Sequence, residues 1–174
     1  MRPVTTRTGE AVPGTGGRVS AGILLYRRRG GRLEVLLAHP GGPFHAKRDL
    51  GNWSIPKGEP APGEDLATAA RREFEEETGV RLPSGSPLSL GSTRQKGGKL
   101  VWAWALEGDL DETGARSNTF EMEWPPGSGQ LHAFPEIDRL AWFEPGEARR
   151  RIKEAQAVFV DRLEDRLEAQ FEGS

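Results

Sequence analysis

The chain has 174 residues, of which 35% are hydrophobic, and its formal net charge is −2. One domain with a sizeable core is the simplest arrangement at this length, and the near-neutral charge provides no general attraction to nucleic acid or to a membrane surface. Cysteine is absent, which excludes disulfides, thiolate metal sites and cysteine nucleophiles. Because neither a signal-peptide pattern nor an apolar run of the ~20 residues needed for a membrane span is found, we expect a cytoplasmic protein.

Two apolar runs near the start of the chain predict a β-hairpin. Residues 19–26 are apolar on both faces, as in a buried strand, and residues 33–38 form a second run. The charged turn 27–32 between them contains a Gly-Gly pair. Its arginines can contact phosphates, but a solvated turn is the simpler interpretation. Residues 1–17, rich in Thr, Gly and Pro, are typical of a mobile tail, so we expect the domain at residues 18–170.

Residues 39–52 follow as a loop that is longer than compact domains usually keep without a function. The loop contains the cations Lys47 and Arg48, which suit phosphate oxygens and are assigned to substrate binding. It also contains His39 and His45, for which a structural role is the simpler interpretation.

The short segment 53–58 leads out of this loop and carries two further candidates for substrate binding. Trp53 is either a core residue, which we favour, or a flat surface on which a base can stack. Lys57 directly precedes Gly58, and its flexible ammonium group suits a phosphate oxygen.

Residues 64–78 predict a helix whose inward face carries carboxylates. At ~100° per residue, an arc of roughly a third of the circle combines apolar residues and glutamates. Its members are Leu66, Ala69, Ala70, Glu73, Glu76 and Glu77. Like charges three and four residues apart repel, and a half-buried carboxylate costs free energy. A hard divalent cation such as Mg²⁺ or Mn²⁺ reverses both penalties, so the pattern favours a metal site over a solvated glutamate-rich helix.

The spacing around this helix strengthens the prediction. Residues 58–80 fit Gly-x5-Glu-x7-Arg-Glu-U-x-Glu-Glu-x-Gly-U, where U is apolar, at every fixed position. These positions are Gly58, Glu64, Arg72, Glu73, Phe74, Glu76, Glu77, Gly79 and Val80. The stretch resembles the signature, or box, of the Nudix hydrolases, which cleave nucleoside diphosphates linked to another moiety. The resemblance implies that Glu73, Glu76 and Glu77 bind the metal and that one of them acts as base toward the attacking water.

Several fixed positions of the box also have a physical reason of their own. Gly58 allows the backbone to come close to an ion. Arg72 lies four residues before Glu76 and can orient its carboxylate, which makes it a further catalytic candidate. Glu64 suits the positive end of the helix dipole, and Gly79 is expected to end the helix as a left-handed cap.

Two strands are predicted after the helix, at residues 88–95 and 99–106, around a turn that contains Gly97 and Gly98. In the second strand large and small residues alternate, which is most often core packing. Trp102 and Trp104 lie on its large face and can alternatively edge a nucleobase pocket.

The rest of the chain predicts the following elements. They are a polar linker at 109–117, a strand at 119–124, a second long loop at 125–135 that contains His132, a strand at 137–143 that closes the sheet, and a helix at 145–166. Because more than one hard ion needs several carboxylates, we expect a further metal ligand from outside the helix. Glu136, between the second long loop and the next strand, is the candidate. Glu121 and Glu123 are the competing carboxylates, and for these two we expect a solvent-facing position on the 119–124 strand instead of a role in the metal site.

These elements predict an α+β fold in which a mixed sheet lies between helices, the three-layer sandwich that the Nudix resemblance implies. The predicted reaction is metal-dependent hydrolysis of a phosphoanhydride bond in a nucleoside polyphosphate. Residues 53–58, and the segment from Glu136 to Phe143, resemble the dinucleoside polyphosphate hydrolase branch, and several cations suit a long phosphate chain. Diadenosine tetraphosphate is therefore the predicted substrate.

Other substrates and another class of protein stay open at this point. (Deoxy)nucleoside triphosphates, nucleoside diphosphate sugars, diphosphoinositol polyphosphates and an RNA 5′ end all carry a suitable bond. The absence of net positive charge argues against long contacts with nucleic acid, so a small nucleotide is the expected partner. A non-catalytic nucleotide sensor is the competing class, although a protein that only binds has less need of all three glutamates.

Overall fold

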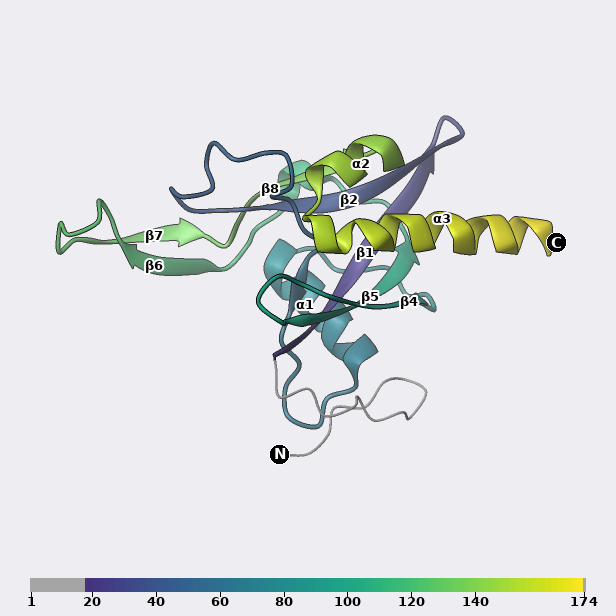
Figure 1. Ribbon diagram of the computed structural model, residues 1–174, viewed down its shortest axis with the longest axis horizontal. Coiled ribbons are helices and arrows are strands. Elements are labelled where there is room, and N and C mark those ends of the chain that lie inside the picture. Colours follow the sequence, from purple (N-terminus) through teal and green to yellow (C-terminus); the bar gives the residue numbers. More distant parts are fainter. Residues whose placement is uncertain (1–17, 174) are drawn as a thin grey trace.

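The computed structural model describes residues 18–173, in which a mixed β-sheet is covered by helices on both faces (Figure 1). The strands are β1 (Val19–Arg29), β2 (Arg32–Pro40), β3 (Lys57–Gly58), β4 (Leu88–Arg94), β5 (Leu100–Glu107), β6 (Thr119–Glu123), β7 (Leu131–Pro135) and β8 (Ile137–Phe143). The helices are α1 (Leu66–Thr78), α2 (Pro145–Arg151) and α3 (Ala157–Glu172), with 3-10 turns η1 (Glu112–Gly114) and η2 (Glu154–Gln156). The predicted tail at 1–17 lies outside the described residues.

The main sheet has the strand order β4-β5-β1-β2-β8, and the short β3 pairs with β1 beside this path. Strands β1 and β5 are parallel, whereas β1–β2, β2–β8 and β4–β5 are antiparallel. The β1–β2 turn consists of Gly30 and Gly31, with φ angles of 59° and 79°. It is shorter than the predicted turn because two residues with positive φ already match the twist of the flanking strands.

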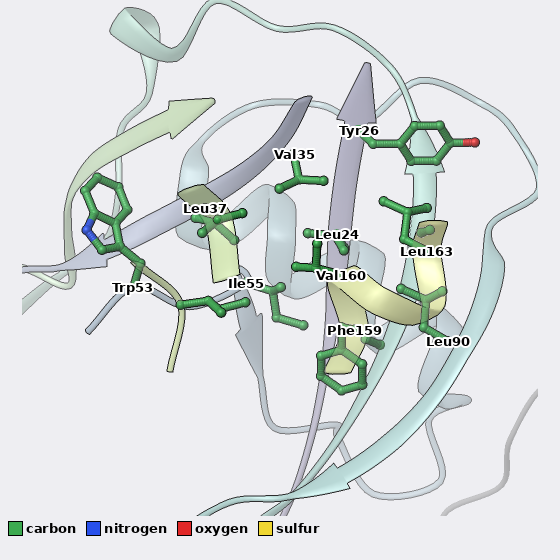
Figure 2. Packing of buried hydrophobic residues seen from close by; sticks show 14 of the residues in the cluster. Leu24, Tyr26, Val35, Leu37, Trp53, Ile55, Leu90, Phe159, Val160 and Leu163 are labelled. Carbon is green, nitrogen blue, oxygen red and sulfur yellow. The ribbon is translucent and has the colours of Figure 1, made fainter. Parts of the chain in front are cut away.

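The alternation of side chains along β1 and β5 separates two cores. On one face the sheet packs against α1, in a cluster that includes Ile23, Leu25, Leu66, Phe74, Trp104 and Leu106. On the other face it packs against α2 and α3, in a cluster that includes Leu24, Leu37, Ile55, Val101, Phe159 and Leu163 (Figure 2). The predicted sandwich and the two faces of the 99–106 strand are therefore confirmed. Within residues 18–173, no helix is both long and apolar enough to cross a membrane.

The prediction of a long loop at 125–135 is wrong. Residues 131–135 form β7, which pairs with β6 in antiparallel register, with Phe120 opposite Phe134. The hairpin projects from the body of the molecule (Figure 1). Because neither face of the hairpin is buried by a second layer, β7 lacks the alternation of apolar and polar residues that marks a half-buried strand. Leu131 is largely exposed.

The prediction of one helix at 145–166 is also wrong. Helix α2 ends at Arg151, and Ile152 adopts an extended conformation with φ −70° and ψ 151°. Ile152 forms an isolated parallel β-bridge with Trp53. The Trp53 N–H donates to the Arg151 carbonyl over 3.0 Å, and the Lys153 N–H donates to the Trp53 carbonyl over 2.8 Å. Since Ile152 and Phe159 are buried on the same side, the apolar spacing of the sequence continues through the break.

Candidate active site

Helix α1 carries the box, and local hydrogen bonds determine both of its ends. Asp65 is the N-cap, and its carboxylate accepts the Thr68 N–H over 3.1 Å, so the helix begins at Leu66, two residues later than predicted. Glu64 therefore belongs to the preceding loop rather than to the first turn. Gly79 has φ 69° and ends the helix as the predicted left-handed cap.

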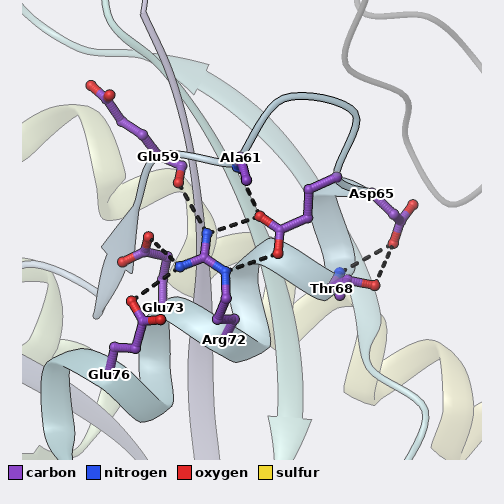
Figure 3. A network of polar contacts seen from close by, with 8 residues as sticks. Glu59, Ala61, Asp65, Thr68, Arg72, Glu73 and Glu76 are labelled. Atoms are coloured by element: carbon purple, nitrogen blue, oxygen red, sulfur yellow. Dashed lines mark hydrogen bonds and ion pairs between the residues drawn. The ribbon is translucent and has the colours of Figure 1, made fainter.

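The guanidinium of Arg72 lies at the centre of a polar network (Figure 3). Its Nη1 donates to Glu73 Oε1 over 2.9 Å and to Glu76 Oε2 over 3.0 Å. Its Nε and Nη2 donate to the two carboxylate oxygens of Glu64, each over 2.8 Å, and the pKa of Glu64 is lowered by this pairing. Arg72 thus makes the predicted contact with Glu76 and also connects the loop before α1 to the glutamates of the helix.

The carboxylate of Glu73 packs directly against Gly58. A Cβ atom on Gly58 would lie 2.0 Å from Glu73 Oε2, so only glycine leaves room for this carboxylate. The sequence predicted that Gly58 belongs to the metal site by letting the backbone come close to an ion; in the structure the glycine also leaves room for the Glu73 side chain. The Glu73 side chain is 15% exposed, and burial raises its pKa. The Glu76 side chain is 49% exposed and lies at the outer edge of the predicted inward arc.

Glu77 is the second partly buried carboxylate. Its Oε2 accepts the backbone N–H of Lys57 over 3.4 Å, and burial raises its pKa to about 7. The negative charge of Glu136 contributes to this increase, so Glu136 lies within electrostatic reach of Glu77. Backbone hydrogen bonds hold Glu136 between β7 and β8: its N–H donates to Asn118 and its carbonyl accepts from Gly41.

The donor set fits a hard divalent cation in its chemistry. Glu73 and Glu77 are carboxylates whose charged forms are destabilised by burial, and a cation would compensate this cost. Across residues 18–173, however, no three acidic or histidine side chains converge as a ready-made metal-binding group. Glu73 and Glu76 instead turn toward Arg72. Their predicted role as ligands, together with Glu136, therefore belongs to the proposed function.

The cations near the box differ in part from those predicted. Burial, together with the charges of Lys99 and Lys153, lowers the pKa of Lys57 to about 8. Lys153 was not predicted, because the apolar spacing placed it on the surface of a continuous helix. Lys47 and Arg48 are exposed on the 41–52 loop, and in the described part of the chain no ion pair or side-chain hydrogen bond joins them to the box.

Trp53 and His39 have structural roles. Trp53 is 1% exposed, its Nε1 donates to Asp49 over 2.8 Å, and its ring lies edge-on to His39 and Phe143. The assignment of Trp53 to substrate binding is therefore corrected, because a ring enclosed in this way offers no face to a base. His39 is fully buried and its Nδ1 lies 2.7 Å from Asp138. Trp104 is likewise in the core, at 4% exposed.

A cavity of about 290 Å³ adjoins Glu77. It lies between the η1 segment and the start of β8, and its lining is largely polar. The lining residues are Glu77, Glu112, Thr113, Ala115, Ser117, Ile137, Asp138, Arg139 and Leu140. The sequence analysis predicts a polar linker and a strand for these residues but no cavity, because the two segments come together only in the tertiary fold.

Comparison with known families identifies the class. The NUDIX domain model matches residues 16–163, so the chain belongs to the Nudix family. This confirms the resemblance of the box, and with it the predicted enzyme class at the level of the family.

Two curated relatives are similar over short stretches. The asymmetrical bis(5′-nucleosyl)-tetraphosphatase of Caenorhabditis elegans is 39% identical over 61 residues, which are 35% of this chain and 40% of that protein. An RNA pyrophosphohydrolase of Caulobacter vibrioides is 47% identical over 53 residues, 28% of this chain and 31% of that protein. The matches thus span less than half the length of either relative.

Solved structures show the same fold over most of the chain. The C. elegans Ap4A hydrolase in a binary complex aligns with a TM-score of 0.58 and 23% identity, over 87% of this chain and 98% of that one. The NUDIX domain of Shewanella oneidensis NrtR, complexed with ADP ribose, aligns with a TM-score of 0.60 and 14% identity, over 87% and 88%. The predicted α+β sandwich is therefore that of the Nudix family.

Proposed function

We propose that the protein is a metal-dependent hydrolase that cleaves a phosphoanhydride bond in a nucleoside polyphosphate. One observation carries this proposal: two partly buried carboxylates, Glu73 and Glu77, lie within electrostatic reach of each other, and Glu77 is also within reach of the cation Lys57 and of Glu136. Buried groups of this kind are costly for stability and are typical of sites that act on a charged substrate.

In the proposed mechanism each side chain has a separate task. Glu73, Glu76 and Glu77, with Glu136, would hold Mg²⁺ or Mn²⁺; when bound, the ion neutralises phosphoryl oxygens and makes water a better nucleophile. Arg72 orients Glu73 and Glu76 through its hydrogen bonds. One of the carboxylates removes the proton of the attacking water, and Lys57 binds a phosphate oxygen.

Diadenosine tetraphosphate is the proposed substrate, hydrolysed with one water to ATP and AMP. The short similarity to the C. elegans tetraphosphatase supports this choice, as does the presence of several lysines beside the box. The cavity next to Glu77 has a suitable size and polarity for one nucleoside. The Caulobacter relative makes a 5′-triphosphorylated RNA the second candidate.

A panel of substrates tests the proposal. Diadenosine tetraphosphate, nucleoside triphosphates, ADP-ribose, a diphosphoinositol polyphosphate and a short 5′-triphosphate RNA are each incubated with Mg²⁺ or Mn²⁺ in H₂¹⁸O, and the products are identified by mass. We expect ATP and AMP from diadenosine tetraphosphate, with ¹⁸O in one of them. Rapid turnover of another compound, and none of this one, would refute the substrate but not the chemistry. Binding without turnover of any compound would indicate a sensor.

A further inference from the structure

Three lysines from separate segments approach one another beside the box. Lys57 belongs to β3, Lys99 directly precedes β5, and Lys153 lies in the break between α2 and η2. After burial, the positive charges of Lys99 and Lys153 are the next largest influences that lower the pKa of Lys57. The pKa of Lys153 is lowered first by burial and then by Lys99. The three ammonium groups therefore lie close enough to repel one another.

The acidic groups around these lysines do not form ion pairs with all of them. Lys99 Nζ lies 4.0 Å from Glu59 Oε1, while Glu59 and Glu77 only partly offset the positive charge around Lys57. Within residues 18–173, no ion pair or hydrogen bond reaches the ammonium group of Lys57 or of Lys153. Half-buried ammonium groups without such partners cost free energy, and a bound anion would remove this cost.

Gln156 fixes the relative positions of the segments. Its side chain is fully buried, its Oε1 accepts the Ile55 N–H over 3.1 Å, and its Nε2 donates to Ser54 Oγ over 3.0 Å and to Gln95 Oε1 over 2.7 Å. The side chain thus joins the end of η2 to residues 54–55, just before β3, and to the β4–β5 turn.

Gln95 and Gln156 also make backbone hydrogen bonds to Lys99 and Lys153, respectively. The Gln95 N–H donates to the Lys99 carbonyl over 2.7 Å, and the Gln156 N–H donates to the Lys153 carbonyl over 2.8 Å. The break after α2, which costs helical hydrogen bonds, is what allows Lys153 to take this position. These backbone hydrogen bonds, with those of the Gln156 side chain, therefore place the segments of the three lysines beside one another.

We propose that Lys57, Lys99 and Lys153 form a subsite for the linear polyphosphate chain of the substrate. The inference rests on the proposed function, which places the cleaved bond at the carboxylates. Lys57 connects the two parts, since its backbone N–H donates to Glu77 while its ammonium belongs to the cluster. Three point charges on flexible stems suit three or more phosphates, which is more than a diphosphate requires.

Binding of inorganic tripolyphosphate in the presence of EDTA tests the subsite without metal and without turnover. Calorimetry compares the wild type with Lys99→Gln, Lys153→Gln and the charge-preserving Lys153→Arg. Lys96→Gln is the matched control, because Lys96 is an exposed lysine of the same β4–β5 turn. We expect Lys153→Gln and Lys99→Gln to weaken binding about tenfold, the size of one charge-assisted contact. Lys153→Arg should restore most of the affinity, and Lys96→Gln should bind as the wild type does.

The outcomes separate this inference from the proposed function. If Lys153→Gln binds tripolyphosphate as the wild type does, or if Lys96→Gln loses as much affinity, the subsite is refuted even where diadenosine tetraphosphate is hydrolysed. If the lysine variants lose affinity for tripolyphosphate but the wild type hydrolyses no nucleotide, the subsite is supported and the proposed reaction is refuted. Displacement of tripolyphosphate by inositol hexakisphosphate at a tenfold lower concentration would overturn the linear chain as the ligand.

Discussion

Arg72 shows at the scale of one residue why the spacing of the box matters. Its planar guanidinium reaches Glu64 on one side and both Glu73 and Glu76 on the other. Only arginine presents donors in this fork, because the ammonium of lysine is a single point of charge. The spacing of Glu64, eight residues before Arg72, therefore serves a contact between the loop and the helix.

Arg72→Lys is expected to lower kcat at least tenfold and stability by roughly 1–2 kcal/mol, because it loses the bidentate contact with Glu64 and frees two carboxylates. Denaturant unfolding and steady-state kinetics measure the two effects. Arg71→Lys is the matched control, since Arg71 is the adjacent residue and donates hydrogen bonds to the carbonyls of Pro83 and Gly85. Equal effects at the two positions would show that the fork of Arg72 has no special role.

Glu77→Gln tests the carboxylates themselves. Glutamine keeps the shape of the side chain but removes the charge, so we expect activity to fall by two or more orders of magnitude. Without metal the variant should be no less stable than the wild type, because burial penalises the charged form of Glu77. Glu75→Gln, on the same helix but bonded to the Leu82 N–H, should keep near wild-type activity. A Glu77→Gln enzyme with normal turnover would contradict the site.

At the scale of elements, local patterns were sufficient where an element packs on a core. The alternation in 99–106 predicted its two faces, and the periodicity of α1 predicted the burial of Leu66, Ala69 and Ala70, because burial on one face imposes the period. The predicted arc of α1 omitted the buried Ala67 and Phe74 and included the half-exposed Glu76. They failed for β7, which packs on no second layer, and at Ile152, where pairing with Trp53 overrides the helical pattern. Lys153 was missed for the same reason, since its position depends on contacts between distant segments.

Asp49 connects the 41–52 loop to α2 and offers a test of this long-range pairing. Its carboxylate accepts Trp53 Nε1 over 2.8 Å and Arg151 Nη1 over 2.7 Å, and the bond from Trp53, followed by Arg151, lowers its pKa. Since the folded pKa is depressed, the stabilisation is present above the unfolded value of about 3.9 and is lost as the pH falls below it.

We therefore expect Asp49→Asn to lower the free energy of unfolding at pH 7 by on the order of 0.5 kcal/mol, a small value because the group is about half exposed. The difference from the wild type should shrink as the pH falls through 4 to 3. Urea unfolding at a series of pH values measures it. A difference that does not change with pH would mean that the charge of Asp49 contributes nothing.

At the scale of the whole molecule, the main sheet lies between α1 on one face and α2 and α3 on the other, and the short strand β3 interacts with residues of both sides. Strand β3 pairs with β1 at Ala21 and Gly22, so Gly58 faces Glu73 of α1 while Lys57 joins the lysines near η2. The candidate site thus combines glutamates of α1 with lysines from β3, from the β4–β5 turn and from the segment between α2 and η2. The sequence predicts the layers and the glutamates of α1. It does not predict that all three lysines lie beside these glutamates, because this depends on contacts between segments that are distant in the chain.

Binding of a divalent ion should accordingly stabilise the entire fold. A ligand that binds only the native state adds ~2.7 kcal/mol at a free concentration of 100 times its Kd, which corresponds to a rise in Tm of roughly 5–10 °C for a domain of this size. We expect Mn²⁺ to raise the Tm of the wild type in this way. Glu136→Ala should need about tenfold more Mn²⁺ for the same rise, because it removes one anionic ligand near Glu77.

Glu121→Ala is the control, since Glu121 is an exposed carboxylate on β6 of the neighbouring hairpin. Its titration with Mn²⁺ should coincide with that of the wild type. If Glu136→Ala also coincides, Glu136 is not a ligand, and the ion is held by the glutamates of α1 alone. A wild type whose Tm does not respond to Mn²⁺ or Mg²⁺ would remove the metal from the mechanism. In that case the burial of Glu73 and Glu77 would have to be offset by Arg72 and Lys57 without an ion.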